Sequence, residues 1–278
     1  MVNMYDYESL EKDIKKWKAL GAAVESIGRS SAGREIYCIK TGFGGKSVIV
    51  HGAIHAREHI SARLVSAQTD YYLNNPPAGT IYFIPMVNPD GVEICKSGFG
   101  EVLNPELAAA LAGSGKDPRL FKANANGVDL NVNFDADWGY GEKNVHNAGC
   151  ENYIGEYPES EPESRALADF TRLCRPSGTL SYHAKGEEIY WYFKQRGDIA
   201  ERDLNIARKI ADITGYPLIL TPGSSGGYKD WCVSVFEIPS LTIEIGSDFC
   251  DYYSLYDSFT SIFTKNRLVP GVFLKNLY

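Results

Sequence analysis

The sequence predicts an α/β fold, a single-domain αβα sandwich with a mixed, largely parallel central sheet, and three observations support this. Strand-like segments alternate with helix-like segments, which is typical of domains built on parallel strands. The 278 residues contain no internal repeat, low-complexity segment or Pro/Ser-rich linker, so we expect one domain over 1–278. Polar residues that could form a site, His55, His183 and Glu244, fall at the carboxyl ends of predicted strands. Active sites of α/β folds gather at this edge of the sheet.

The first third of the chain alternates between the two kinds of element. Leu10, Ile14 and Trp17 recur at helical spacing, which predicts an amphipathic helix over 7–19. The segments that follow are expected to be a strand over 35–41, a glycine turn over 42–45, a strand over 47–51, a helix over 58–74 and a buried strand over 80–87. Asn88-Pro-Asp-Gly91 is a strong turn signal and is expected to follow that strand as a turn.

The remaining elements are less regular, and a long loop-rich stretch separates them from the first group. Ser160 and Glu163 have the spacing of a capping box, which predicts a helix that starts near Ser160. The other expected elements are a short helix around 105–111, a short segment over 128–133, a strand over 178–182, an aromatic core strand at 190–193, a helix around 206–213, a strand over 240–245 and a C-terminal helix around 255–263.

Composition excludes several classes of protein. The net charge of −7 and a pI near 5.3 argue against a nucleic-acid partner, which would require a basic surface. The chain contains no apolar run long enough for a membrane helix, so we expect no membrane partner. Charged residues stand where a signal peptide would be apolar, so we expect a cytoplasmic protein, or a secreted or cell-wall protein if a leader has been removed. The oligomeric state stays open.

A cluster of metal-ligand residues lies between the strand ending at His51 and the next helix. His55 and Glu58 have H-x-x-E spacing, and zinc accepts both imidazole nitrogen and carboxylate oxygen. A catalytic zinc needs a third protein ligand, and two residues compete for this place. His59 would complete an H-x-x-E-H pattern, in which Glu58 is the base and both histidines bind the metal from one helix. His183 would complete the site from a distant strand and leave His59 outside it.

Five motifs then occur in one order along the chain. They are Gly52–Glu58 (G-x-x-H-A-R-E), Gly127–Asn131 (G-V-D-L-N), Ser181–His183 (S-Y-H), Gly226–Trp231 (G-G-Y-K-D-W) and Thr242–Glu244 (T-I-E). This series is similar to that of the zinc metallocarboxypeptidase family, the carboxypeptidase A-like peptidases. The resemblance extends over roughly residues 25–250, nearly the whole chain. It implies the fold of that family and a zinc peptidase activity.

The resemblance also implies roles for individual residues. It makes His55, Glu58 and His183 the ligands of one zinc ion, and Asp129 the carboxylate that orients His55. Glu244 becomes the general base, which takes a proton from the attacking water and delivers it to the leaving amine.

Further residues of the family's pattern contact the substrate. A cation stabilises the oxyanion, and the family places it after an aromatic residue upstream of G-V-D-x-N. Lys122, which follows Phe121, is the best match, with Arg119 as the alternative. Arg57 and Asn131 are implied as substrate-binding residues.

The chain departs from the family's pattern at three places. Val132 stands where the family has the arginine that clamps a substrate's C-terminal carboxylate, so cleavage at ordinary C-termini is in doubt. Lys229 stands at the position that selects the side chain after the cleaved bond, and we expect it to favour a carboxylate. The family's tyrosine is absent from residues 220–225, and we expect Tyr228 to bind substrate in its place.

The phrases Ser181–Gly186 and Gly223–Gly227 are most similar to those of bacterial γ-D-glutamyl-L-diamino acid endopeptidases. Those enzymes cut the γ-D-Glu–diaminopimelate bond of cell-wall peptides, so we expect a peptide or muropeptide substrate. A metallocarboxypeptidase for acidic C-terminal residues is the alternative, with Lys229 again contacting the side chain. The missing arginine and tyrosine leave a non-catalytic peptide-binding relative as a further alternative.

Overall fold

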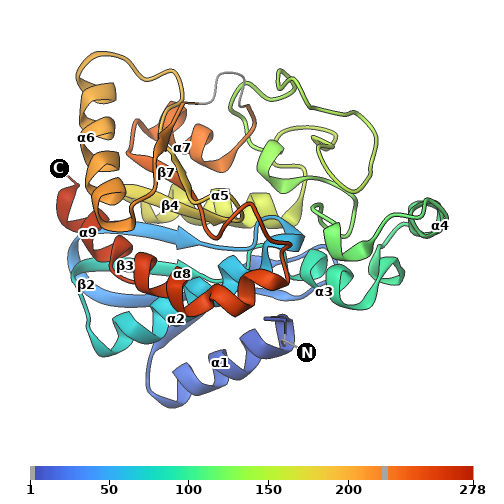
Figure 1. Ribbon diagram of the computed structural model, residues 1–278, viewed down its shortest axis with the longest axis horizontal. Coiled ribbons are helices and arrows are strands. Elements are labelled where there is room, and N and C mark those ends of the chain that lie inside the picture. The colour runs from blue at the N-terminus through green and yellow to red at the C-terminus, as the bar shows by residue number, and fades with distance from the viewer. Residues whose placement is uncertain (1–3, 221–224, 278) are drawn as a thin grey trace.

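A mixed seven-stranded sheet runs through the middle of the molecule with helices on both faces, which confirms the predicted fold class (Figure 1). The computed structural model describes residues 4–220 and 225–277. The strands are β1 (Ala23–Arg29), β2 (Glu35–His51), β3 (Ala78–Ile84), β4 (Gly178–His183), β5 (Glu188–Tyr190), β6 (Leu218–Ile219) and β7 (Ser240–Glu244). The helices are α1 (Tyr7–Ala19), α2 (His59–Asn74), α3 (Pro89–Ser97), α4 (Pro105–Gly113), α5 (Pro162–Cys174), α6 (Gly197–Thr214), α7 (Tyr228–Phe236), α8 (Phe259–Asn266) and α9 (Val269–Asn276).

The order of the strands brings three carboxyl ends together. The sheet runs β1-β2-β4-β7-β5-β6, and β3 pairs with β2. β2 is parallel to β3 and β4, and β4 is parallel to β7, whereas β1 and β5 are antiparallel to their neighbours β2 and β7. Because parallel strands end at the same edge, the residues that follow β2, β4 and β7 meet there.

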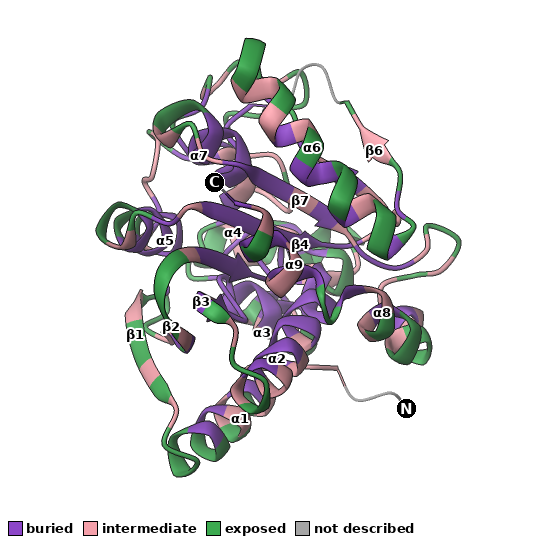
Figure 2. Ribbon diagram, turned by 90° about the vertical axis from the view of Figure 1, so that its left-hand side faces the viewer, coloured by how far each residue is buried: buried purple, intermediate pink, exposed green. Residues whose placement is uncertain are grey.

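Each face of the sheet carries its own hydrophobic core. Helices α2 and α9 pack on one face, α8 and α6 lie beside them, and α5 and α7 cover the other face (Figure 2). Side chains alternate between the two cores along β2: Val48 and Val50 belong to the first, and Ile49 belongs to the second. The central strands are therefore buried on both faces.

Strand β2 corrects one prediction. We expected two strands separated by a turn at Gly42–Gly45, but β2 is continuous from Glu35 to His51. Gly42 has φ +70°, and a Cβ there would collide with the carbonyl oxygen of Gly79 in β3. The glycines therefore permit an irregular stretch in which β2 shifts register against β3 without ending the strand.

Two helix starts also differ from expectation. The predicted turn at Asn88 is the beginning of α3, where Asn88 Oδ1 accepts a hydrogen bond from Gly91 N and Pro89 takes the first helical position. The predicted capping box at Ser160 is wrong, because α5 begins at Pro162. The Glu163 carboxylate is instead buried and accepts a hydrogen bond from Ser31 N, at 2.8 Å.

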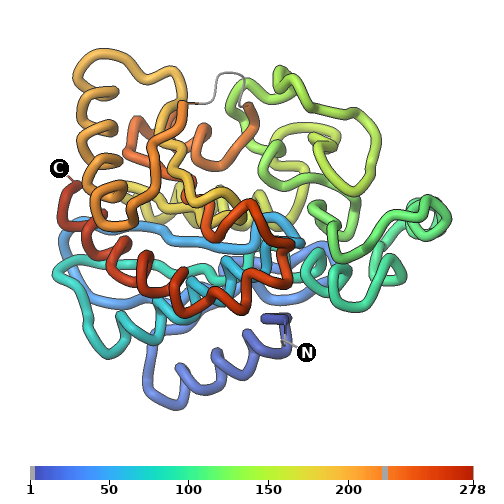
Figure 3. The backbone as a smooth tube through the Cα atoms, in the orientation of Figure 1, coloured from blue at the N-terminus to red at the C-terminus, as the bar shows by residue number. Residues whose placement is uncertain are grey.

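The region between α3 and α5 contains no strand among the described residues and forms the irregular end of the molecule (green in Figure 3). It is attached to the carboxyl edge of the sheet by backbone contacts, among them Ala56 N donating to Lys122 O at 3.1 Å. Asn88 Nδ2 donates to Ala123 O at 3.0 Å. This attachment places the G-V-D-L-N motif beside the ends of β2 and β4.

The chain after β7 consists of short helices. A 3-10 turn over Ser254–Ser258 leads into α8, and α9 follows directly. The predicted C-terminal helix is therefore divided, and its second part was not expected. In the described part of the chain, none of the helices combines the length and apolar character that spanning a membrane requires.

Candidate metal centre and substrate pocket

The turn after β2 carries the H-x-x-E motif and is held tightly. It ends in a 3-10 helix, Ala56–Glu58, which leads directly into α2. Ser61 in α2 fastens it, because Ser61 Oγ accepts from Ala53 N at 2.7 Å and donates to Glu58 O at 2.6 Å. A Cβ on Gly52 would lie 2.7 Å from the Ser61 carbonyl oxygen, so only glycine fits. The positions of the motif's side chains are thus set by backbone packing.

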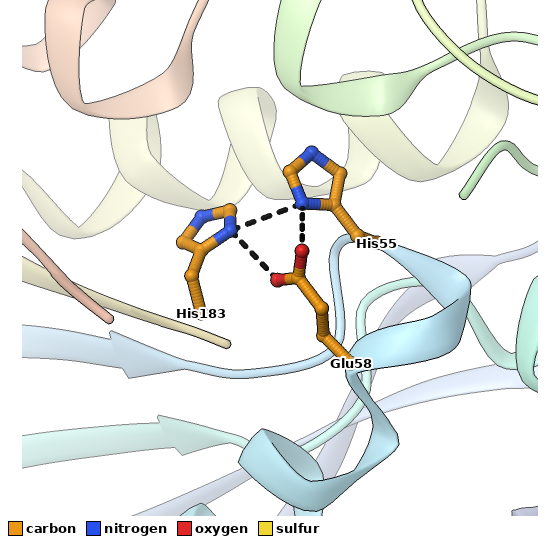
Figure 4. Close-up of side chains that lie close together, drawn as sticks. All are labelled: His55, Glu58 and His183. Carbon is orange, nitrogen blue, oxygen red and sulfur yellow. Dashed lines mark hydrogen bonds and ion pairs between the residues drawn. The ribbon is translucent and has the colours of Figure 1, made fainter. Parts of the chain in front are cut away.

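Three of the predicted site residues converge at this edge (Figure 4). His55 Nδ1 lies 2.8 Å from Glu58 Oε1, and His183 Nδ1, at the end of β4, lies 2.9 Å from Glu58 Oε2. The two Nδ1 atoms are 3.1 Å apart. All three side chains are buried. In the described part of the chain this is the one group of three or more such residues that could hold a metal ion.

The donor set fits zinc. With zinc–nitrogen and zinc–oxygen distances of about 2.0–2.2 Å, ligand atoms around a tetrahedral ion lie about 3.3 Å apart, close to the separations found here. Burial lowers the pKa of His183 despite the opposing effect of Glu58, which favours the neutral ring that binds metals. Burial alone would raise the pKa of Glu58, but the His55 and His183 rings outweigh it and lower that pKa.

Asp129 and Lys122 lie behind His55. Asp129 Oδ1 is 3.3 Å from His55 Nε2, and Lys122 Nζ is 2.8 Å from Asp129 Oδ2. Burial opposes ionisation of Asp129, but Lys122 and His55 lower its pKa, so a carboxylate is maintained next to the ring. Arg119, the alternative cation, pairs with Asp117 at 2.7 Å on the surface. The geometry therefore favours Lys122 over Arg119 as the cation beside the centre.

Glu244 lies next to His183 across the sheet. The two residues are partners in the parallel β4–β7 ladder, so their side chains project from the same face of neighbouring strands about 4.8 Å apart. Burial and the negative charge of Glu58 raise the pKa of Glu244 well above its ordinary value. A carboxyl group with this environment readily accepts and returns a proton.

A pocket of about 200 Å³ opens beside Glu244. Its lining combines polar, aromatic and charged residues: Asn131, Tyr190, Tyr192, Gly227, Lys229, Asp230, Thr242 and Glu244. The pocket is partly open to solvent and is large enough for one amino-acid side chain. The pocket therefore has the dimensions of a subsite for a single amino-acid side chain.

Lys229 lies in the first turn of α7. Its ammonium group is buried, donates to Tyr192 O at 3.0 Å and forms an ion pair with Asp230. An ammonium group has three donors, so these two contacts leave one for a bound molecule. Lys229 is therefore a partly neutralised cation in the pocket and not a solvated surface lysine.

Two sequence predictions are wrong. Tyr228 does not reach the pocket, because its side chain is fully buried between the sheet and α5 and its hydroxyl lies 2.8 Å from Thr171 Oγ1. The H-x-x-E-H interpretation also fails. The His59 ring points elsewhere, with Nδ1 2.6 Å from the hydroxyl of Tyr256, and it is not part of the three-residue group.

Sequence reasoning missed the positions of two tyrosines. Tyr190 lines the pocket, although we assigned it to the core, and its hydroxyl donates to Glu188 at 2.8 Å. The alternation Glu188-Ile189-Tyr190, with only the isoleucine buried, was a signal for this arrangement. Tyr252 was also missed. Its ring lies 5.4 Å from the guanidinium carbon of Arg57, the residue before Glu58, and nothing in its local sequence indicates this position; burial and the charge of Glu58 raise its pKa to about 12.

Comparison with known proteins agrees with this geometry. A family model described as zinc carboxypeptidase matches residues 12–256. A gamma-D-glutamyl-L-diamino acid endopeptidase 1 from Lysinibacillus sphaericus is 32% identical over 263 residues. That alignment covers 87% of this chain and 66% of the relative, so the chain spans slightly less than two thirds of its length.

Solved structures show the same fold. The chain resembles bovine thrombin-activatable fibrinolysis inhibitor, described in complex with tick carboxypeptidase inhibitor, with a TM-score of 0.78 and 20% identity over 98% of this chain and 95% of that chain. It also resembles the murein-tripeptide amidase MpaA from Escherichia coli O157, with a TM-score of 0.61 and 22% identity over 89% of this chain and 92% of that one.

Proposed function

The chain belongs to the zinc carboxypeptidase family and is by that membership a zinc metallopeptidase, and we propose that it hydrolyses a γ-D-glutamyl–diaminopimelate bond in bacterial cell-wall peptides. The observation that carries the proposal is the meeting of His55, Glu58 and His183 beside a pocket that contains both Glu244 and Lys229. The relative from Lysinibacillus sphaericus, named for this linkage, supports the choice of substrate.

We assign the zinc ion of the family to His55, Glu58 and His183. When bound, zinc polarises the amide carbonyl and lowers the pKa of water toward about 7. Glu244, beside His183 on the neighbouring strand, takes the proton of the attacking water and returns it to the leaving amine. Lys122, whose ammonium lies 2.8 Å from the Asp129 carboxylate, holds that carboxylate against the His55 ring.

The pocket suits the side chain of diaminopimelate. That side chain ends in a carboxylate and an amine, and the remaining donor of Lys229 can bind the carboxylate. The amine would then meet the acidic and phenolic side of the pocket, where Asp230 and Tyr190 lie. Val132 cannot clamp a C-terminal carboxylate, which agrees with a bond inside a longer peptide.

The test is to identify the products of a defined muropeptide. The zinc-loaded protein is incubated with L-Ala-γ-D-Glu-meso-diaminopimelate-D-Ala, and the products are separated and weighed by mass spectrometry. We expect L-Ala-D-Glu and diaminopimelyl-D-Ala. Release of free L-Ala, or no cleavage while zinc is bound at one ion per chain, would overturn the proposal. Glu244→Gln serves as the inactive control.

Lys229 also supports a second candidate, a carboxypeptidase that removes acidic C-terminal residues. The same assay with a peptide ending in Ala-Glu separates the two functions. Release of free glutamate from that peptide, with no cleavage of the muropeptide, would indicate the carboxypeptidase. Stoichiometric zinc without turnover of either substrate would indicate a peptide-binding relative.

A further inference from the structure

Two cations share one aromatic ring next to the metal-ligand group. The guanidinium carbon of Arg57 lies 5.4 Å from the centroid of the Tyr252 ring, and Lys185 Nζ lies 6.0 Å from the same centroid. Arg57 directly precedes Glu58, and Lys185 follows His183 by two residues, so the segments that supply the ligands also supply the cations. We refer to Arg57, Lys185 and Tyr252 as the cationic rim.

The contacts of the rim leave its positive charge largely available. Arg57 Nη1 donates to Leu120 O and lies near Glu151 Oε2, both at 3.2 Å, and the Glu151 side chain is 48% exposed. Lys185 Nζ donates to the backbone oxygen of Asp248 at 2.7 Å, and the Asp248 carboxylate is 3.6 Å away and 66% exposed. In both ion pairs the cation is only 21% exposed and its carboxylate partner is more exposed, and both cations have further donors.

The rim lies next to the metal-ligand residues but outside the pocket. Arg57 and Glu58 are consecutive residues of one 3-10 helix, and the Tyr252 ring lies 5.4 Å from the Arg57 guanidinium carbon, so the rim adjoins the metal ligands. None of the three rim residues lines the pocket that contains Lys229. A substrate whose side chain fills this pocket therefore places the residue on the other side of the scissile bond near the rim.

We propose that Lys185 and Arg57 bind the free α-carboxylate of the γ-linked glutamate that precedes the cleaved bond. This inference rests on the proposed function and adds a second specificity site to it. In an ordinary peptide, the α-carboxyl group of that residue forms the cleaved amide. A γ-linkage uses the side-chain carboxyl instead, so a free α-carboxylate remains a few bonds from the reacting carbon. The rim would thus distinguish γ-linked from α-linked glutamate.

Two matched substrates test the rim. They are L-Ala-γ-D-Glu-meso-diaminopimelate and the same peptide with its glutamate α-carboxylate replaced by a carboxamide. The amide keeps the size of the group and removes its charge. We expect the wild-type protein to cleave the carboxylate substrate with at least a tenfold higher kcat/KM, mainly through a lower KM, because the interaction is made on binding.

The variants separate charge from structure. Lys185→Met should reduce several-fold the preference in kcat/KM for the carboxylate substrate over the carboxamide substrate, and Arg57→Met should have a separate effect of the same kind. Lys185→Arg keeps the positive charge and should retain the preference. Lys209→Met, which removes an exposed lysine from α6, is the control and should match the wild type. Zinc content and thermal unfolding of each variant show that it is folded and loaded.

The outcomes distinguish this inference from the proposed function. Cleavage of both substrates with equal kcat/KM by the wild type overturns the rim and leaves the function standing. The same holds if the preference is unchanged in both Lys185→Met and Arg57→Met. If the wild type cleaves neither substrate, the proposed function fails, and the inference fails with it.

Discussion

The Nδ1 atoms of His55 and His183 face each other at 3.1 Å, with the Glu58 carboxylate in contact with both. At most one proton can lie between two such nitrogens, whereas one divalent cation can accept a lone pair from each. The carboxylate supplies the negative charge that makes such a cation favourable in a buried place. We therefore expect the purified protein to bind one zinc ion per chain.

The roles of Glu58 and Glu244 predict opposite behaviour for their glutamine variants. Glu244→Gln should keep zinc and lose about 10²- to 10⁴-fold in kcat, the usual contribution of general acid–base catalysis. Glu58→Gln should lose zinc, because the charge between the two histidines is removed. Zinc analysis and kcat measured on the same preparations decide this. A Glu58→Gln protein with full zinc and no activity would reverse the two assignments.

Asp129 is expected to act through His55. Asp129→Asn removes the charge that faces the ring and should weaken zinc binding about 10- to 100-fold, as outer-shell changes at zinc sites do. Competition with a chelator of known affinity measures the change. Asp135→Asn, at a nearby exposed position, is the matched control and should bind zinc as the wild type does. Equal zinc affinities in the two variants would contradict the role of Asp129.

Lys229 is expected to discriminate between diamino acids. The wild type should cleave peptides with meso-diaminopimelate at least tenfold faster, in kcat/KM, than peptides with L-Lys, which lacks the distal carboxylate. Lys229→Met alone would leave Asp230 without this ion-pair partner, which is destabilising when a pair is buried. The double variant Lys229→Met/Asp230→Asn avoids this and should abolish the discrimination. Equal wild-type rates on both peptides would remove the role of Lys229.

Glu163 should make stability depend on pH. Burial raises the pKa of its carboxyl to about 7, so the folded state favours the protonated form. Its stabilising contribution is complete below the unfolded pKa near 4.5 and is lost as pH rises to about 7. Relative to Glu163→Gln, the wild type should lose about 3 kcal/mol of unfolding free energy over this range. Denaturant unfolding at several pH values measures it, with exposed Glu156→Gln as the control; parallel curves for wild type and Glu163→Gln would contradict it.

The sequence predicts the layers of this fold well because its patterns are local. The apolar residues of α1 recur at helical spacing, and polar and apolar residues alternate along β4 and β7, so both patterns can be recognised without knowledge of their neighbours. The irregular stretch of β2 is different. Gly42–Gly45 has the composition of a turn, and only the presence of β3 alongside keeps this segment in the sheet.

In the candidate site, too, the sequence does not predict contacts that depend on distant segments of the chain. The ordered motifs predicted which residues meet, because the carboxyl ends of parallel strands share an edge. They did not predict that Tyr228 would be buried. Its backbone N–H donates to Asn131 Oδ1, 97 residues away in sequence, at 3.2 Å, and this contact at the start of α7 depends on the assembled fold. The position of Tyr252 beside Arg57 likewise depends on how the chain returns after β7.

Glu58 and His183 are 125 residues apart in sequence, and the parallel pairing of β2 with β4 brings them together. In the unfolded chain these ligands are not held together, so zinc binds the folded state and stabilises it. Each tenfold rise of free metal above its dissociation constant adds about 1.4 kcal/mol to that state. When zinc is scarce, the protein would therefore lose folding free energy as well as activity. Molecules without zinc would unfold more often and be degraded more readily.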